Sequence, residues 1–280
     1  MPEELVVEKG LYQLSPSKLA AFVTCPVMFR ARYLLGIKSP VSPSMVLGRA
    51  VHSALERLGR FRQLELEIGL PELFVEFNEA FKADLAKESI ELKADEESKL
   101  RAGGEGLVKI YFDRFGQERP IASELHLDEP LINPISGEAY QRPAMSDIEP
   151  GDLGMYGIVD SLLDEGDGLV VVDYKTSSKT TDSSSIMMTH RVQLLAYAYL
   201  MQRASDKPIK ALEVRQLVRK KEPDIHVTRV PVPPKLSFQS MFMAIESLLD
   251  SLNSGAFLAR YGWHCHGSCE GYGLCSPLDS

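Results

Sequence analysis

Apolar residues recur at helical spacing through the first part of the chain. A helix start is expected at Ser15-Pro16, because serine caps helix N-termini and proline fits the first turn. Pro26 should interrupt this helix directly after Cys25, since proline lacks the amide that a helix interior needs. Further helical patterns cover residues 29–35, 46–62, 71–116, 185–203 and 235–253. Within the acidic stretch 71–116, Gly103-Gly104 predicts a break.

The hydrophobic period changes to alternation near residue 121, which is typical of strands. Strands are predicted over residues 121–127, 157–163, 169–174, 210–218 and 224–231. The segment 128–153 holds four prolines and is predicted to be a long, partly ordered loop. The tail 261–280 is rich in cysteine and glycine, and little regular structure is expected there. The pattern therefore indicates an α/β fold with a helical insertion at about 65–116.

Composition narrows the class of protein. The chain has 280 residues, 44% hydrophobic and 25% charged, the ordinary mix of a soluble globular protein. No apolar run is long enough to span a membrane, and the acidic start predicts no secretory signal, so we expect a cytoplasmic, reducing environment. The net charge of −8 argues against a simple basic nucleic-acid binder. Both ends are nevertheless mildly basic, so a polyanion can meet them while the acidic middle stays solvated.

Two carboxylates and a lysine carry the sharpest chemical signal. Asp160 ends the motif Gly157-Ile158-Val159-Asp160, and Asp173-Tyr174-Lys175 ends the next predicted strand. A short acidic turn joins these strands, so both carboxylates should reach one cation, and a hard cation such as Mg²⁺ prefers oxygen ligands. Lys175 leaves the same strand face as Asp173 and can stabilise charge on a phosphate. The simpler alternative is that both acids merely close strands and Lys175 pairs with one of them.

Four motifs in order resemble a known family. They are Gly48…His52, Gly157…Asp160, Asp173-Tyr174-Lys175 and Gln193…Tyr197. Gln193 and Tyr197 share one helical face. As a set, the motifs resemble the RecB-like branch of the PD-(D/E)XK nuclease superfamily. The resemblance implies a restriction-endonuclease-like α/β core of the αβββαβ type, with a central mixed sheet flanked by helices.

The resemblance also implies roles for individual residues. It assigns His52, Asp160, Asp173 and the Tyr174 carbonyl to an Mg²⁺ or Mn²⁺ site, Lys175 to catalysis, and Gln193 and Tyr197 to orienting the active site or the DNA. Glu124 matches a glutamate often seen in the first strand, and it receives a lesser role because an edge salt bridge explains it equally well. His126, His190 and His226 are expected to have no chemical role. Arg219-Lys220-Lys221 is expected to be a solvated turn, with phosphate contact as the alternative.

The four cysteines form a second candidate site. Cys25 stands alone, and Cys265, Cys269 and Cys275 follow near the end with C-x₃-C-x₅-C spacing. In a reducing compartment such a set more often binds metal than forms disulfides. The residues alone leave zinc open, with His264 or His266 able to replace a thiolate.

The resemblance favours iron–sulfur chemistry for these cysteines. A subset of RecB-like nucleases, including the AddB-type and the CRISPR-adaptation nucleases, has one cysteine before the histidine motif and three near the C-terminus, which hold a [4Fe–4S] cluster. The cluster would join the two ends as a structural staple. The implied organisation is an N-terminal helical segment 1–45, a nuclease core 46–255 and a cluster-closing segment 256–280.

The leading hypothesis is a metal-dependent DNA nuclease. It would be an exonuclease on single strands or DNA ends, acting in recombination, repair or DNA processing, with other recombination proteins as possible partners. One alternative is a CRISPR-adaptation nuclease that trims spacer precursors beside other adaptation proteins. Another is a non-catalytic DNA-binding or scaffolding module, which predicts loss of Asp160, Asp173 or Lys175; none is lost.

Overall fold

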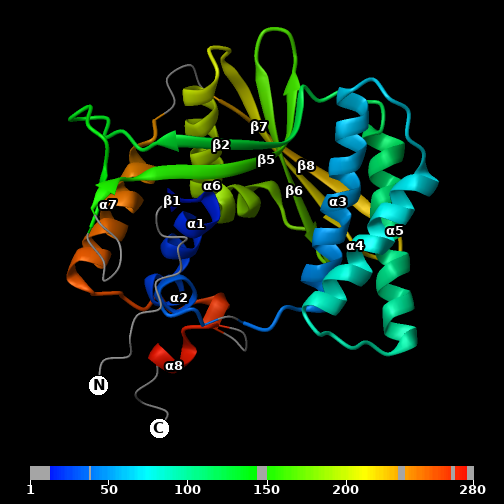
Figure 1. Cartoon of the computed structure of the whole chain (residues 1–280), viewed down its shortest axis with the longest axis horizontal. Coiled ribbons are helices and arrows are strands. Elements are labelled where there is room, and N and C mark those ends of the chain that lie inside the picture. The colour runs from blue at the N-terminus through cyan, green and yellow to red at the C-terminus, as the bar shows by residue number, and fades with distance from the viewer. Residues whose placement is uncertain (1–12, 38, 144–149, 233–236, 266–268, 276–280) are drawn as a thin grey trace.

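A central mixed sheet carries helices on both faces (Figure 1). The computed structural model describes residues 13–37, 39–143, 150–232, 237–265 and 269–275. The helices are α1 (Pro16–Thr24), α2 (Pro26–Phe29) with a π-helical turn (Arg30–Leu34), α3 (Pro43–Gln63), α4 (Leu70–Lys87), α5 (Ala94–Phe115), α6 (Ser183–Ala204), α7 (Gln239–Ser254) and α8 (Tyr272–Cys275), besides a 3-10 turn (Trp263–Cys265). The strands are β1 (Gln13–Leu14), β2 (Ala122–Pro130), β3 (Gln141–Arg142), β4 (Gly151–Asp152), β5 (Gly154–Asp164), β6 (Leu169–Ser177), β7 (Ile209–Val218) and β8 (Asp224–Pro231).

The sheet has the order β1-β5-β6-β7-β8, and β2 pairs with β5. β6 and β7 are parallel and joined through α6, while β5–β6, β2–β5 and β7–β8 are antiparallel. The succession α3-β2-β5-β6-α6-β7 is the αβββαβ core expected from the sequence, so the α/β fold class is confirmed.

Two hydrophobic cores lie against the two faces of the sheet. α1, α6 and α7 bury one set of apolar side chains, including Phe22 and Met155. α3, α4 and α5 bury the other set, including Phe77 and Val172. Because the long acidic region packs in this way, its apolar positions belong to the core although its outer face is charged. No helix in the described part of the chain has the length and apolar character needed to cross a membrane.

Polar caps begin two of the helices, and the cap at Ser15 is the one that the sequence predicts. The Ser15 hydroxyl accepts the Lys18 backbone N–H at 3.1 Å and begins α1. Asp182 caps α6 in the same way, with 3.0 Å to the Ser185 N–H. α1 ends at Thr24 and α2 begins at Pro26, so the predicted interruption is confirmed. These caps matter for function because they fix where α1 and α6 begin relative to the sheet.

The predicted break at Gly103-Gly104 is wrong. α5 runs without interruption through both glycines, and the chain leaves helix earlier, between α4 and α5. A methyl group on Gly104 would overlap the ring of Phe77 on α4. Gly104 therefore permits two helices to pack closely instead of ending one of them.

The region 128–153 is more regular than predicted. β2 extends to Pro130, an isolated bridge joins Ile132 to Ala139, and β3 pairs with β4. Leu131 and Tyr140 are buried in the first core, which explains this order. The part of the predicted loop at 144–149 lies outside the described residues, as do positions 235 and 236 of the last predicted helix, which begins at Gln239.

β5 and β6 pair over only a short length before they separate. Their ladder covers Ser161–Asp164 against Leu169–Val172, while β5 continues alongside β2 and β6 continues alongside β7. The two strands diverge beyond this ladder (Figure 1). Asp160 and Asp173 are the next residues on either side, so the fold places both acids at the opening of this fork.

We expect Gly104→Ala to destabilise the protein by about 1–3 kcal/mol, because the added methyl overpacks the α4–α5 contact. Gly103→Ala is the matched control. Its methyl would meet Cδ of Arg219 at 2.8 Å, and this flexible stem can move. Urea unfolding measures both variants. Equal free energies of unfolding for the two would contradict the close-packing role of Gly104.

Candidate active site

Asp160 completes the hydrogen bonding of the fork. Its Oδ2 accepts the backbone N–H of Tyr174 at 2.6 Å, where the β5–β6 ladder no longer supplies a partner. Burial, followed by the nearby Asp173 carboxylate, raises the pKa of Asp160 well above its ordinary value. A cation bound beside such a buried carboxyl lowers its pKa again and stabilises the charged carboxylate.

His52 reaches the same point from α3. Its Nδ1 lies 3.8 Å from Oδ1 of Asp160, and its ring packs edge-on against Tyr174 with centroids 5.9 Å apart. Gly48 permits this approach, because a Cβ there would lie 2.6 Å from Oγ1 of Thr176 on β6. Burial and then the positive charge of Lys175 lower the pKa of His52 to about 4. The imidazole is therefore neutral at pH 7, the form that binds metal.

Glu124 contributes the third side chain of the cluster. The ligand atoms of His52, Glu124 and Asp160 all lie within 4.8 Å of one another, which makes them a candidate metal centre. Burial and then Glu56 raise the pKa of the Glu124 carboxyl. The sequence alone predicts a lesser role for Glu124, with an edge salt bridge as the alternative. In the structure, Glu124 is as good a candidate ligand as His52 and Asp160.

The backbone of Glu124 is unusual for a strand. Its φ is +51°, and it falls between the paired residues Ser123 and Leu125 of the β2–β5 ladder. A non-glycine residue in this left-handed region costs on the order of 1–3 kcal/mol. Such strain persists only where surrounding contacts enforce it, and here it accompanies a carboxylate that faces Asp160 and His52.

Asp173 lies beside this cluster and pairs with Lys175. Its Oδ1 accepts a hydrogen bond from Nζ of Lys175 at 2.8 Å. Its Oδ2 is 2.7 Å from the same nitrogen as an ion pair, but it lacks hydrogen-bond geometry and is a buried oxygen without a hydrogen-bond partner in the described structure. The fork therefore holds a carboxylate–lysine pair on β6, and the three-residue group that includes Asp160 lies next to it, on the side of the neighbouring strand β5.

Helix α6 adds residues from the other side. Gln193 and Tyr197 are both buried, four residues apart on one face of α6, as their spacing predicts. Burial, then the charges of Asp173 and Asp160, raise the pKa of Tyr197, which keeps its hydroxyl protonated. These effects place Tyr197 close to both acids of the fork.

His190 also lies in this region, beside Gln193; the expectation that it has no chemical role stays a prediction. Its Nδ1 lies 3.2 Å from Oε1 of Gln193. Burial and then the positive charge of Lys175 lower its pKa, so it is neutral near Lys175. Its position three residues before Gln193, on the same helical face, is a sequence signal that could have placed it there.

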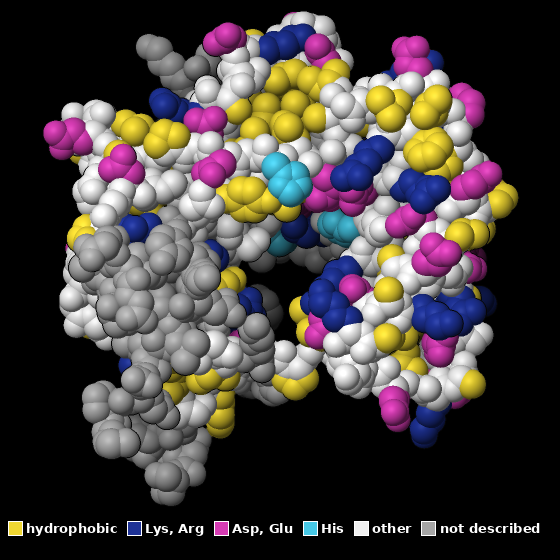
Figure 2. Space-filling view, in the orientation of Figure 1, with side chains coloured by type: hydrophobic (Ala, Val, Ile, Leu, Met, Phe, Trp, Pro, Cys, Tyr) yellow, Lys and Arg dark blue, Asp and Glu magenta, His cyan; other side chains and the backbone are white. Residues whose placement is uncertain are grey.

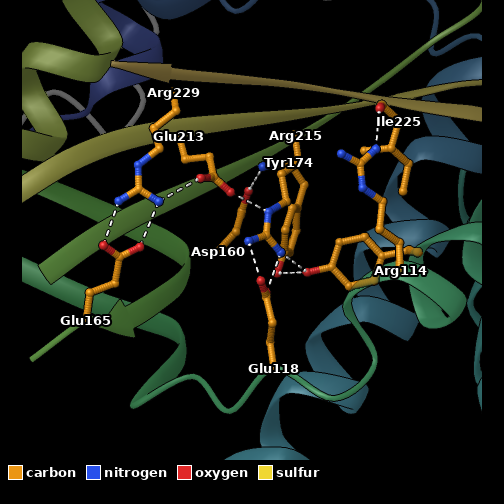
Figure 3. Close-up of polar contacts among 10 residues, drawn as sticks. Arg114, Glu118, Asp160, Glu165, Tyr174, Glu213, Arg215, Ile225 and Arg229 are labelled. Atoms are coloured by element: carbon orange, nitrogen blue, oxygen red, sulfur yellow. Dashed lines mark hydrogen bonds and ion pairs between the residues drawn. The ribbon is translucent and has the colours of Figure 1, made fainter. Parts of the chain in front are cut away.

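A buried network behind the fork holds Tyr174 in place (Figure 3). The Tyr174 hydroxyl lies 2.8 Å from that of Tyr111 on α5, which accepts a hydrogen bond from Arg215 at 2.9 Å. Arg215 forms two bonds with Glu118 and one with Glu213, and its guanidinium stacks 3.9 Å from the Phe115 ring centre. The strand segment that carries Asp173 and Lys175 is thereby anchored to both α5 and β7.

The cluster opens into a surface groove between the sheet and α3. The groove has a volume of about 600 Å³, and its lining includes His52, Glu56 and Lys175. Figure 2 shows histidine and acidic side chains together in a hollow at the centre of this face, with basic side chains at its edge. The hollow is therefore open to a large ligand.

The four cysteines lie in the region where the N-terminal and C-terminal segments of the described chain meet, with α2 packed against α8. Cys25 is buried at the start of α2, and its Sγ accepts the Arg260 backbone N–H at 3.5 Å. Burial raises the thiol pKa of Cys269 and Cys275, and the charges of Cys25 and Cys265 raise both further. Two contacts seal this region, the Arg32–Glu270 ion pair and the packing of Gly271 against Val27. His264 bonds the Arg260 carbonyl, and His266 lies outside the described residues.

Comparisons with known proteins agree with this architecture. Over 121 residues, 43% of this chain, the sequence is 30% identical to one component of the ATP-dependent helicase/nuclease of Alkaliphilus metalliredigens (strain QYMF), and the match spans a tenth (10%) of that protein's length. The crystal structure of a proposed exonuclease from Eubacterium rectale has the same fold, with a TM-score of 0.51 at 13% identity over 91% of this chain and 84% of that one. The family model of the PD-(D/E)XK nuclease superfamily matches residues 13–276. With its αβββαβ core and the acidic cluster at the fork, the chain belongs to the PD-(D/E)XK nuclease superfamily.

Proposed function

We propose that this protein is a divalent-metal-dependent deoxyribonuclease that acts on single strands or DNA ends. The observation that carries the proposal is the convergence of His52, Glu124 and Asp160 at the strand fork, directly beside the Asp173–Lys175 pair. Acidic oxygens, a neutral imidazole and one lysine form the set that metal-assisted phosphodiester hydrolysis requires. The exonuclease description of the Eubacterium rectale protein and the nuclease description of the Alkaliphilus protein agree with this chemistry.

The donor set fits Mg²⁺ or Mn²⁺. His52, Glu124 and Asp160 would hold the ion, and the buried, unbonded Oδ2 of Asp173 and the Tyr174 carbonyl are the further candidate ligands. The raised pKa values of Asp160 and Glu124 support this assignment, because a cation relieves the electrostatic strain that raises them. When bound, a divalent cation supplies the Lewis acidity for attack on the phosphodiester.

Lys175 is the side chain that would stabilise charge on the phosphate during the reaction. Its Nζ is held by Asp173 and its side chain is 28% exposed, so it faces the groove while keeping a fixed position. In this position the ammonium stabilises the negative charge that develops on a phosphate during attack. Tyr197 and Gln193 keep the acids oriented from the α6 side, and the neutral His190 adds no competing charge beside Lys175.

The substrate's strandedness and the biological pathway stay predictions. Recombination, repair and CRISPR adaptation are the pathways that the sequence resemblance proposes, and the match to the Alkaliphilus protein covers a small part of that protein. Labelled single-stranded and duplex DNA, incubated with Mg²⁺ or Mn²⁺, test the proposed activity directly. Absence of cleavage of every substrate with either ion would contradict the proposed function.

Glu124→Gln should reduce Mn²⁺ affinity by more than about 100-fold, the upper end for loss of an outer-shell partner alone. The amide keeps the size of the side chain but loses the anionic oxygen, so the fold is retained. Calorimetric titration with Mn²⁺ measures the affinity. Glu138→Gln, at an exposed loop position, is the matched control and should bind as the wild type does. Wild-type affinity in Glu124→Gln would remove Glu124 from the metal site.

Lys175→Ala should lower the turnover number by about 10²–10³-fold, the usual loss on removing one charge-stabilising donor. Metal binding should persist, because an ammonium donates no electron pair to a cation. Single-turnover cleavage and Mn²⁺ titration together separate the two effects. A variant that loses metal affinity and activity in parallel would show that Lys175 supports the metal site instead of the reaction.

We further propose that Cys25, Cys265, Cys269 and Cys275 hold a [4Fe–4S] cluster. Support comes from the position of these cysteines where α2 meets α8, and from the thiols of Cys269 and Cys275, whose pKa is raised by burial and then by the charges of the other cysteines; binding of a metal to the thiolates removes this repulsion. Backbone N–H groups of Arg260 and Gly262 already point at the sulfurs of Cys25 and Cys265. Such N–H donors stabilise the charge on sulfur ligands.

Protein purified without air should be brown and should contain about four iron atoms per chain, as a cluster with four cysteine ligands requires. Cys275→Ser should lose both colour and iron and should lower the melting temperature, because the two ends of the chain lose a shared anchor. Metal analysis and thermal unfolding measure these effects. About one zinc per chain without iron would replace the cluster with a zinc site and leave the nuclease proposal intact.

A further inference from the structure

A second, small pocket of about 60 Å³ lies beside the active-site groove and shares Ser44 and Thr176 with it. Three further polar residues line it, Ser177, Ser178 and Arg219. Ser44 is the second residue of α3, so the positive end of that helix dipole adds to the pocket. Among the described residues that line the pocket, none is acidic.

Arg219 differs from the other basic residues at this end of the sheet. Its backbone N–H donates to the Ser177 carbonyl at 2.8 Å, and its stem lies over Gly103 on α5. In contrast, Lys220 pairs with Asp224 at 3.1 Å. Within the described part of the chain, the guanidinium of Arg219 forms no ion pair, and its stem passes beside Gly103. A half-buried, uncompensated cation therefore faces a pocket that is lined by hydroxyl groups and by the leucines Leu47 and Leu107.

We propose that Arg219 and the hydroxyls of Thr176 and Ser178 form a binding subsite for a backbone phosphate that flanks the scissile phosphate; the Ser177 hydroxyl already donates to the Lys179 carbonyl. This inference rests on the proposed nuclease function. Arginine and hydroxyl donors match phosphate oxygens, and contacts of this kind bind nucleic acid without regard to base sequence. Thr176, which lines the pocket, is the residue directly after Lys175. A DNA strand that places one phosphate at Lys175 therefore brings a neighbouring phosphate toward this pocket.

Charge explains why such a subsite is needed. The protein carries a net charge of −8, and two carboxylates, Glu124 and Asp160, belong to the cluster that His52 joins to the groove. A polyanion gains little from the general field of such a surface, so affinity must come from local cationic contacts. The Arg219 subsite lies at the end of the groove near the α3 N-terminus, away from the carboxylates, and supplies one such contact.

Arg219→Gln tests the subsite by separating binding from turnover. KM for a single-stranded oligonucleotide should rise about tenfold, while kcat at saturating DNA stays within about twofold of wild type, because a contact to a flanking phosphate acts mainly on binding. The slope of log affinity against log salt should fall by about 0.7, the value for one phosphate contact on a single strand.

Lys221→Gln is the matched control, because it removes the same charge from an exposed position in the same turn. It should leave KM and the salt slope unchanged. Ser178→Asp is the second variant: the residue is exposed, so folding is preserved, and the new carboxylate should weaken DNA binding at least as much as Arg219→Gln.

Three outcomes would overturn the subsite. Arg219→Gln could bind DNA as the wild type does, Lys221→Gln could weaken binding equally, or Ser178→Asp could leave affinity intact in a folded protein. Failure of the proposed function looks different. If the wild type binds DNA without cleaving it, and Arg219→Gln still weakens binding against an unaffected Lys221→Gln, the subsite stands and the nuclease assignment falls.

Discussion

The separation of β5 from β6 is the constraint on which the site depends. Where the backbone ladder stops, the N–H of Tyr174 needs a partner, and the carboxylate of Asp160 provides it. That one bond fixes an acid of the cluster relative to the strand that carries Asp173 and Lys175. His52 packs against the same tyrosine. The chemistry is therefore assembled around a gap in the sheet, where polar side chains replace missing main-chain pairing.

The buried charges behind Tyr174 support this arrangement from α5 and β7. Arg215 is 2% exposed, and its partner Glu213 is 5% exposed, so both ions have lost their hydration. Such groups are tolerable only when fully bonded, and Arg215 meets this condition through Glu118, Glu213 and Tyr111. α5 lies wholly within the region predicted as a helical insertion. Its C-terminal end is thus joined to the segment that holds Lys175.

Local patterns in the sequence were sufficient for much of the fold and for part of the site. Alternating strands ended by Asp160 and Asp173 predicted a carboxylate pair at one place, and the spacing of Gln193 and Tyr197 predicted a shared helical face. These signals are local, because side chains two apart in a strand or four apart in a helix lie on the same side.

Features that depend on distant elements could not be predicted in this way. Gly104 was interpreted as a helix break because the Phe77 ring that it accommodates lies on another helix. The influence of Lys175 on His190 joins a strand to α6, and Glu124 lies with His52 and Asp160 only because α3, β2 and β5 meet in the fold. The three segments proposed from the sequence as domains, like the roles of the individual site residues, stay predictions.

Folding and binding place opposite demands on residue 124. The left-handed backbone there suits glycine, yet only a longer acidic side chain brings an oxygen to His52 and Asp160. Glutamate at this position therefore makes the strand less stable than glycine would. A ligand that binds only to the folded state would offset this loss of stability. Selection for thermostability alone would therefore tend to replace this glutamate, and a consensus or stability-guided redesign of the chain should hold position 124 fixed.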